Sequence, residues 1–516
     1  MKQTSPQPEV AVLDFGSQYT QLIARRLREV GVFSEIYPYH RYRDLLGREE
    51  IRGVVLSGGP SSVQEEGSPD IGDELYGEGK PLLGICYGMQ LMCRALGGTI
   101  ESSANREYGP ATIECGSSSR LFAETPDRQG VWMSHGDRVG DLPEGFATLA
   151  SSGAIPYAAA GDEARGFYCV QFHPEVVHTE HGLQILHNFC RDICAIDTSW
   201  SADAFVDSSV RRIRERVGDR KVLCAVSGGV DSTVAATLID QAVGDRLHTV
   251  FVDNGLLRLG EASEVERTLN AFLHRPVLRV DARNAFLNGL RGVTDPEAKR
   301  RIIGNTFIET FRTATADLGP FTFLAQGTLY PDRIESESVN GPSHVIKTHH
   351  NVGGLPEELG FELIEPLDEL FKDEVRRVGR SLGIPDELLM RHPFPGPGLG
   401  VRILGEVTRE SVRLLQQADH IFINELRESG EYDRIWQAGA VLLPIRTVGV
   451  MGDQRTYESV VALRAVTSRD GMTADWARIP DAVLARVSNR IINEVPGINR
   501  VAYDISSKPP STIEWE

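Results

Sequence analysis

The sequence has few cysteines, no long apolar run and no excess of basic charge. Seven cysteines in 516 residues are too few for a disulfide framework. No stretch of about 18 apolar residues predicts a transmembrane helix, and residues 1–10 lack the apolar core of a signal peptide. We therefore expect a cytoplasmic protein with no membrane partner.

Basic residues are scarce relative to acidic ones. The chain has 54 Lys and Arg against 72 Asp and Glu, a net charge of −18. Nonspecific nucleic-acid binding requires a basic surface, so we expect no nucleic-acid partner. A small anionic nucleotide is still compatible with this charge, because a few arginines and a helix N-terminus are enough to bind it.

The length predicts about three domains of roughly 100–200 residues each. Short apolar runs alternate with helical patterns over the first third of the chain, at residues 10–13, 54–56 and 82–85. A second series of this kind begins after a change of pattern near residue 199. Such alternation indicates mostly parallel sheets with helices on both faces, an α/β fold.

A Pro- and Gly-rich stretch at residues 391–400 precedes a smaller α+β segment. We therefore predict domains over residues 1–198, 199–396 and 397–516. Residues 332–356 have few apolar side chains and read as a long loop, and loops of that length are usually functional or disordered.

Cys86 stands at the centre of a Gly-Ile-Cys-Tyr-Gly motif, residues 84–88. Small residues on each side allow the sharp strand-to-helix turn that exposes a nucleophile. The thiol would face the positive end of the following helix, which favours the thiolate. The other six cysteines lack this context and are expected to be structural.

A cysteine nucleophile needs a base, and His173 is the best candidate. Pro174 favours an extended conformation at His173. Residues two apart in an extended segment face the same way, so Glu175 can orient the imidazole. The three residues would form a Cys-His-Glu triad.

These motifs resemble class I glutamine amidotransferases over about the first 195 residues. The matching pieces are residues 57–60, 84–88 with Gln90, 134–137 and 171–175. The resemblance implies that Cys86 attacks the side-chain amide of L-glutamine, forms a thioester and releases ammonia. It also implies that the N–H groups of Gly59 and Tyr87 stabilise the oxyanion.

A glycine-rich turn follows the strand predicted at residues 222–226 and opens a helix. Two glycines let the backbone approach a phosphate, and the successive N–H groups bind it. The string resembles the ATP-pyrophosphatase family, which implies a doubly wound domain that cleaves ATP to AMP and pyrophosphate. Its residues are Ser227, Gly228, Gly229, Val230, Asp231, Ser232 and Thr233. Magnesium is expected to accompany ATP, with Asp231 as the candidate ligand.

The two halves have a joint chemical logic. Ammonia needs an activated carbon, and an adenylated carbonyl oxygen leaves as AMP. Five further motifs resemble the GMP synthase family and extend the match to the last residue; they occupy residues 294–301, 326–332, 346–354, 392–399 and 508–516. The resemblance implies XMP as the acceptor, a dimerisation role for the last domain and a homodimer.

Several residues in or near these motifs suit the recognition of XMP. Its phosphate requires basic partners, and Arg300 and Lys508 are the candidates. Glu514 could accept hydrogen bonds from the ribose or base, and Asp453 is a further candidate. Lys347 lies in the long loop and would reach the phosphate of the adenylate when the loop closes.

Three alternatives differ in class. A related adenylating enzyme could make a carboxamide, although the C-terminal motif argues against it. A regulator built on an inactive glutaminase fold would be expected to have lost Cys86. An enzyme that thiolates tRNA could use the same ATP motif, but the net charge of −18 and the glutaminase motifs disfavour it.

Overall fold

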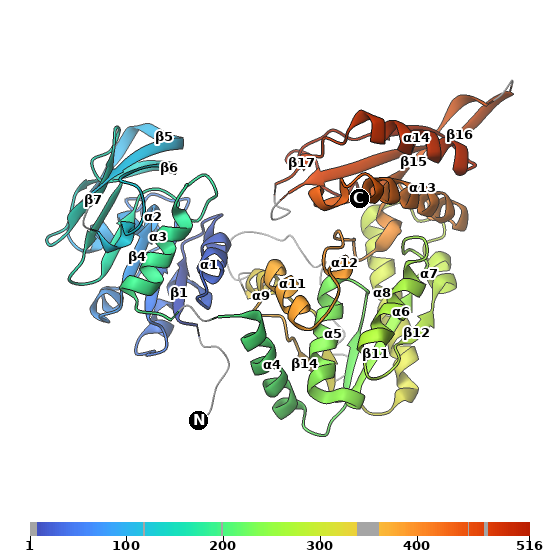
Figure 1. Cartoon of the computed structure of the whole chain (residues 1–516), viewed down its shortest axis with the longest axis horizontal. Coiled ribbons are helices and arrows are strands. Elements are labelled where there is room, and N and C mark those ends of the chain that lie inside the picture. The colour runs from blue at the N-terminus through green and yellow to red at the C-terminus, as the bar shows by residue number, and fades with distance from the viewer. Residues whose placement is uncertain (1–7, 117–118, 198–199, 338–360, 452–453, 469–472) are drawn as a thin grey trace. The chain divides into compact units, whose positions relative to one another are not determined.

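The computed structural model describes residues 8–116, 119–197, 200–337, 361–451, 454–468 and 473–516 (Figure 1). Among these residues, no helix is both long enough and apolar enough to cross a membrane. The chain forms two compact units. The first runs to Ser208 and includes the end of α9 (Tyr330–Glu337) from Ile334, and the second runs from Ser209 to Arg333 and on to Glu516.

The first unit is built on a nine-stranded sheet in the order β2-β1-β3-β4-β9-β8-β7-β5-β6. The strands β2, β1, β3, β4 and β9 pair in parallel, whereas the other pairs are antiparallel. Its strands are β1 (Val10–Asp14), β2 (Ser34–Pro38), β3 (Gly53–Leu56), β4 (Leu82–Ile85), β5 (Thr99–Cys115), β6 (Arg128–Asp141), β7 (Ala147–Ser152), β8 (Ala159–Asp162) and β9 (Phe167–Val170). Its helices include α1 (Thr20–Glu29), α2 (Tyr87–Ala95) and α3 (Gly182–Asn188).

The structure confirms the strands predicted in this unit. Their predicted segments are apolar throughout, which explains their place in the sheet. Every residue of β3 and β4 is buried, as expected for central strands covered on both faces. The short parallel strands end at one edge of the sheet, where the loops after β1, β3 and β4 meet. This edge carries the cysteine motif.

The second unit contains a five-stranded parallel sheet in the order β12-β11-β10-β13-β14. Its strands are β10 (Val222–Ala225), β11 (Leu247–Asp253), β12 (Leu278–Asp281), β13 (Phe323–Ala325) and β14 (Glu362–Ile364). Its helices include α5 (Val230–Val243), α6 (Glu261–Phe272), α7 (Arg283–Gly289), α8 (Pro296–Thr315), α11 (Lys372–Ser381) and α12 (Asp386–Leu389), and α4 (Ala202–Val217) spans the boundary between the units.

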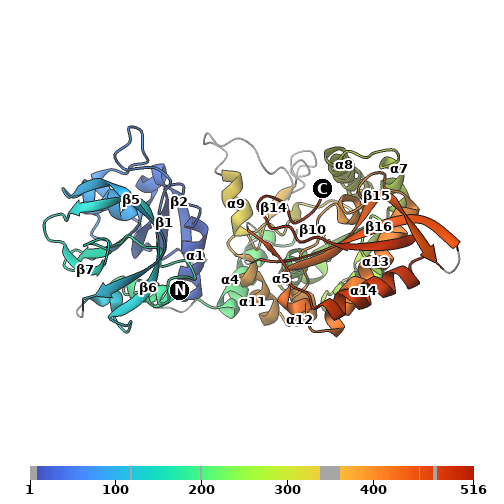
Figure 2. The same ribbon diagram turned by 90° about the horizontal axis from the view of Figure 1, so that it is seen from above.

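The C-terminal part of this unit forms a second, four-stranded sheet. The long strands β15 (Gln437–Met451) and β16 (Gln454–Thr467) form an antiparallel hairpin, joined by β17 (Asp475–Trp476) and β18 (Ile498–Tyr503). Helices α13 (Arg409–Glu428) and α14 (Asp481–Glu494) pack against each other and against these strands (Figure 2). The three-part α/β and α+β architecture is confirmed, while the predicted boundary near residue 396 stays a prediction.

Local chemistry explains where several helices begin. The Asp295 carboxylate accepts a hydrogen bond from the Ala298 N–H at 2.8 Å, and Pro296 occupies the first helical position of α8. Thr408 caps α13 in the same way.

The prediction of a long loop at residues 332–356 is wrong at its start, because α9 continues to Glu337. The aromatic ring of Tyr330 is buried and packs edge-to-face on Phe371 at 5.3 Å. Tertiary packing of this kind stabilises a short helix, even where the local sequence pattern does not predict a helix.

Candidate active sites

Cys86 occupies the sharp turn between β4 and α2. Its φ of 52° lies in the left-handed region, which is costly for a residue with a side chain. A Cβ atom at Gly84 would lie 2.6 Å from the Gly88 carbonyl oxygen, and one at Gly88 would lie 2.3 Å from that of Leu56. The two glycines are therefore required by close backbone packing, and the turn has the geometry of a nucleophile elbow.

His173 and Glu175 lie in the loop after β9 and are buried. The imidazole Nδ1 is 2.7 Å from Oε1 of Glu175. A carboxylate only accepts hydrogen bonds, so Nδ1 carries the proton and donates it. The ring of Tyr19 packs edge-on against the imidazole at 5.1 Å, and the Arg26 side chain donates to the Glu175 carbonyl at 2.9 Å.

Opposing effects set the pKa of His173. Burial lowers it, but the negative charge of Glu175 and the hydrogen bond with the Cys86 thiol outweigh burial. The result is a pKa well above the usual value for histidine, so the imidazolium is favoured. This arrangement suits a thiolate–imidazolium pair.

The remaining motifs of the first unit meet around Cys86. Its Sγ lies 3.5 Å from the Ser134 carbonyl oxygen. The Gln90 side chain donates to the Asp137 carbonyl at 2.8 Å, which ties the cysteine helix to the strand that carries residues 134–137. Segments that are far apart in the sequence thus form one site.

The loop at residues 57–60 also lies on this site. A Cβ atom at Gly58 would lie 3.3 Å from Cε1 of His173, and one at Gly59 would lie 3.2 Å from Cγ of Tyr87. Within the described residues, neither the Gly59 nor the Tyr87 N–H donates a hydrogen bond. Both groups are therefore available to an oxygen atom of a ligand.

The glycine-rich turn of the second unit joins β10 to α5. Gly228 has a φ of 78°, and a Cβ atom there would lie 2.3 Å from a methyl group of Val265. The Ser227 and Ser232 hydroxyls lie 3.0 Å apart, and the Ser227 N–H donates to the Ser232 hydroxyl at 3.2 Å. These contacts fix the shape of the loop at the N-terminus of α5.

Asp231, in the first turn of α5, is paired with Lys372. The Lys372 ammonium lies 2.5 Å from each carboxylate oxygen of Asp231. Lys372 begins α11, and sequence reasoning missed it because a lone lysine at a helix start looks like any surface lysine. The pair places a cation beside the glycine-rich turn.

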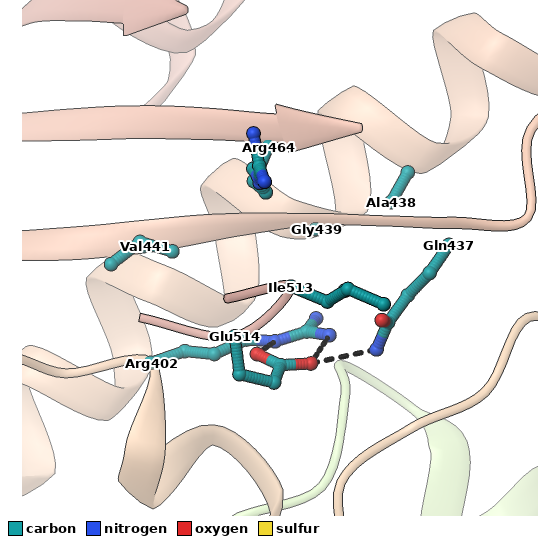
Figure 3. A pocket seen from close by; sticks show the side chains of 8 residues that line it. All are labelled: Arg402, Gln437, Ala438, Gly439, Val441, Arg464, Ile513 and Glu514. Carbon is teal, nitrogen blue, oxygen red and sulfur yellow. Dashed lines mark hydrogen bonds and ion pairs between the residues drawn. The ribbon is translucent and has the colours of Figure 1, made fainter. Parts of the chain in front are cut away.

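A third cluster surrounds the last residues of the chain (Figure 3). Glu514 accepts hydrogen bonds from Nε and Nη2 of Arg402 at 2.9 and 2.7 Å, and from the Gln437 side chain at 2.6 Å. Burial raises the pKa of Glu514, but Arg402 and Gln437 outweigh it and hold the pKa below its usual value. Sequence reasoning missed both of these partners.

The predicted basic residues also meet the chain end. An Arg300 guanidinium N–H donates to the backbone oxygen of Glu516 at 2.5 Å. The neighbouring Lys299 is fully buried and donates to Oε2 of Glu516 and to the Ile403 carbonyl, each at 2.6 Å. Lys508 pairs through its backbone with Ala474. Asp453 and Lys347 lie outside the described residues.

The fold and two family models define the class of this protein: a class I glutamine amidotransferase followed by a synthetase. Residues 11–193 match the family model described as glutamine amidotransferase class-I, and residues 424–515 match that of the GMP synthase C terminal domain.

Relatives that match over almost the whole chain identify the family within this class. The GMP synthase [glutamine-hydrolyzing] of a Nitratiruptor species is 55% identical, with 98% of this chain and 99% of the relative covered. That of Wolinella succinogenes is also 55% identical, with 98% of each covered, and that of Thermomicrobium roseum is 55% identical, with 99% and 98% covered. The chain belongs to the family of glutamine-hydrolysing GMP synthases. It is a ligase that makes GMP with glutamine as the nitrogen donor.

Proposed function

We propose that Cys86, His173 and Glu175 carry out the glutamine hydrolysis. The observation that carries this assignment is the strained turn at Cys86 beside a buried imidazole held by Glu175 at 2.7 Å. The thiolate attacks the side-chain amide carbon of L-glutamine and forms a C–S bond. The His173 imidazolium gives its proton to the leaving nitrogen, and ammonia departs.

A water molecule then completes the reaction. The neutral His173 accepts a proton from water, and the hydroxide attacks the thioester. The C–S bond then breaks, glutamate leaves, and the thiolate–imidazolium pair is restored. In both tetrahedral intermediates the negative oxygen is bound by the N–H groups of Gly59 and Tyr87. Glu175 stabilises the imidazolium and keeps its ring in one orientation.

The rest of the chain binds and activates the acceptor, XMP. We assign residues 199–396 to ATP binding and adenylation and residues 397–516 to XMP binding and dimerisation. ATP lies on the turn formed by residues 227–233, with its phosphates on the backbone N–H groups. The purine carbonyl oxygen of XMP attacks the α-phosphorus and pyrophosphate leaves. Ammonia then displaces AMP and GMP forms.

Basic residues around the chain end fit the phosphate of XMP. Arg300 and Lys508 are the proposed phosphate ligands, and Glu514 the proposed partner of the ribose or base. Asp453 and Lys347 stay sequence-based proposals for XMP binding and for the closing loop. The ammonium of Lys372, which contacts Asp231, is well placed to stabilise the negative charge of the departing pyrophosphate.

Magnesium fits one feature of this site. The described residues contain no group of three metal-ligating side chains, but Mg²⁺ commonly takes one or two carboxylates together with substrate phosphates. Asp231 is the candidate carboxylate, and its contact with Lys372 would open to admit the ion. Bound magnesium would neutralise charge on the phosphates.

The surface of the C-terminal hairpin supports a homodimer. Val450 is 74% exposed and Tyr457 is 64% exposed, and Val448 lies directly opposite Tyr457 in the register. A cluster of exposed apolar side chains is typical of a surface that binds another protein molecule. We place the enzyme in the cytoplasm, with small molecules and a second copy of itself as its partners.

The test uses the full-length enzyme with ATP, magnesium and XMP, and either glutamine or ammonium as the nitrogen source. We expect GMP, AMP and pyrophosphate with both. Cys86→Ala should abolish synthesis from glutamine and retain synthesis from ammonium. Cys93→Ala, a buried cysteine in the same helix, should retain both. Loss of both activities in Cys86→Ala, or retention of both, would refute the assignment.

A further inference from the structure

Ser57 joins three parts of the glutaminase site. Its side chain is fully buried just after β3. The Ser57 N–H donates to the Leu13 carbonyl at 3.1 Å, and its carbonyl accepts from the Gly88 N–H at 3.1 Å. Its hydroxyl accepts from the Phe15 N–H at 3.0 Å and donates to the Gly58 carbonyl at 2.8 Å. The residue therefore links the ends of β1 and β3 to the first turn of the cysteine helix.

The hydroxyl sets the orientation of the peptide group between Gly58 and Gly59. In a planar trans peptide the C=O and N–H bonds point in opposite directions. Because the Ser57 hydroxyl holds the Gly58 carbonyl, the Gly59 N–H must point away from Ser57. Glycines on both sides permit other backbone conformations, so local sterics alone do not select this one.

This peptide group lies at the reacting centre. The missing side chain of Gly58 faces Cε1 of His173 at 3.3 Å, and that of Gly59 faces the ring of Tyr87 at 3.2 Å. If the peptide turned over, a carbonyl oxygen would take the place of the Gly59 N–H. A carbonyl dipole there would repel a negative oxygen instead of binding it.

We propose that Ser57 is a positioning residue for glutamine hydrolysis, which holds the Gly58 carbonyl so that the Gly59 N–H faces the oxyanion. The inference rests on the proposed role of that N–H. Ser57 itself touches neither the thiol nor glutamine. It therefore acts on the rate of the chemical steps and leaves the binding of glutamine unchanged.

The experiment measures GMP formation by full-length Ser57→Ala with glutamine and, separately, with ammonium. Removing one oxyanion donor lowers kcat by about 100- to 1,000-fold, and loosening one should lower it by about 10- to 100-fold. We expect this loss in kcat with glutamine, a nearly unchanged KM for glutamine, and an unchanged rate with ammonium. Ser57→Thr keeps the hydroxyl and should recover most of kcat.

Two controls separate positioning from a general loss of structure. Ser34→Ala removes another fully buried hydroxyl, at the start of β2 in the same sheet, which donates to the Ala24 carbonyl of α1 at 2.9 Å. This variant should leave glutamine-dependent kcat unchanged. The rate at which iodoacetamide alkylates Cys86 reports the thiol and its base, with Cys86→Ala as background. This rate should stay the same in Ser57→Ala.

An unchanged kcat in Ser57→Ala would overturn the proposal, as would a parallel fall in the alkylation rate or in the activity of Ser34→Ala. Failure of the underlying assignment gives a different result. If Cys86→Ala retains synthesis from glutamine, the triad itself is misplaced, whatever Ser57→Ala shows.

Discussion

The guanidinium of Arg402 holds the carboxylate of Glu514 through two hydrogen bonds, at 2.9 and 2.7 Å. Arg402 is buried, and its Nη1 lies 3.8 Å from the carboxylate of Asp419. Glu514 thus meets a protein cation, which fixes the carboxylate proposed above as the partner of the ribose or base. The pair is one of several contacts that hold the last residues of the chain, together with those of Lys299 and Arg300 to Glu516.

Arg402→Met should weaken XMP binding. The substitution leaves the carboxylates of Asp419 and Glu514 without their shared cation, and Glu514 should leave its position. Hydrogen bonds to charged groups are worth about 1.5–3 kcal/mol, so we expect the KM for XMP to rise about 10- to 100-fold. Steady-state rates with ammonium as the nitrogen source measure this. The exposed Arg434 offers a control: Arg434→Met should leave the KM unchanged, and an equal effect of both variants would contradict the prediction.

Glu175→Gln should lower the pKa of His173, because the negative charge of Glu175 is the main effect that raises it against burial. ¹³C NMR of labelled histidine can follow the titration, with His173→Gln to assign the signal. The folded state holds this proton more tightly than the unfolded chain. Its contribution to the free energy of unfolding is therefore complete below about pH 6.5 and is lost as the pH rises through the folded pKa. An identical titration in Glu175→Gln would show that the carboxylate does not raise the pKa of the imidazole.

Lys372→Ala should reduce adenylation with either nitrogen source. The ammonium that contacts Asp231 lies beside the glycine-rich turn, and its loss removes positive charge where phosphates bind. XMP-dependent exchange of pyrophosphate into ATP should fall about 10-fold or more. Both partners are partly exposed, so the loss of stability should be only about 1 kcal/mol or less.

Lys221 precedes β10, at the opposite end of the strand from the glycine-rich turn, and provides the matched control. Lys221→Ala should exchange pyrophosphate at the rate of the unmodified enzyme. Normal exchange in Lys372→Ala would mean that its contact with Asp231 is structural only.

The double variant Val450→Asp, Tyr457→Asp should dissociate the proposed homodimer. Both side chains are among the most exposed large apolar groups of the described chain, and a buried carboxylate at an interface is costly. Sedimentation velocity should show a dimer for the unmodified enzyme and a monomer for the variant. Leu278→Asp, on the edge strand of the other sheet, should remain dimeric. An unmodified enzyme that is monomeric at all concentrations would refute the dimer.

The sequence by itself determined the elements and the reactive motifs, because their signals are local. The short apolar runs at residues 10–13, 54–56 and 82–85 predicted β1, β3 and β4 to within one residue of the bounds observed. The glycines around Cys86 identified one turn, because the backbone packs too closely there for a side chain. Gly228 identified the other, because its φ of 78° favours glycine. The i and i+2 spacing of His173 and Glu175 correctly predicted their contact.

Only the tertiary structure decided which distant side chains meet. Lys372 is 141 residues from Asp231, and Arg402 is 112 residues from Glu514. No periodicity marks one arginine or lysine among 54 as the partner of a particular carboxylate. The same holds for the Ser57 hydroxyl, whose partner Phe15 is 42 residues away. Such contacts arise where strand ends and loops converge, and convergence is a property of the packed sheet rather than of any short segment.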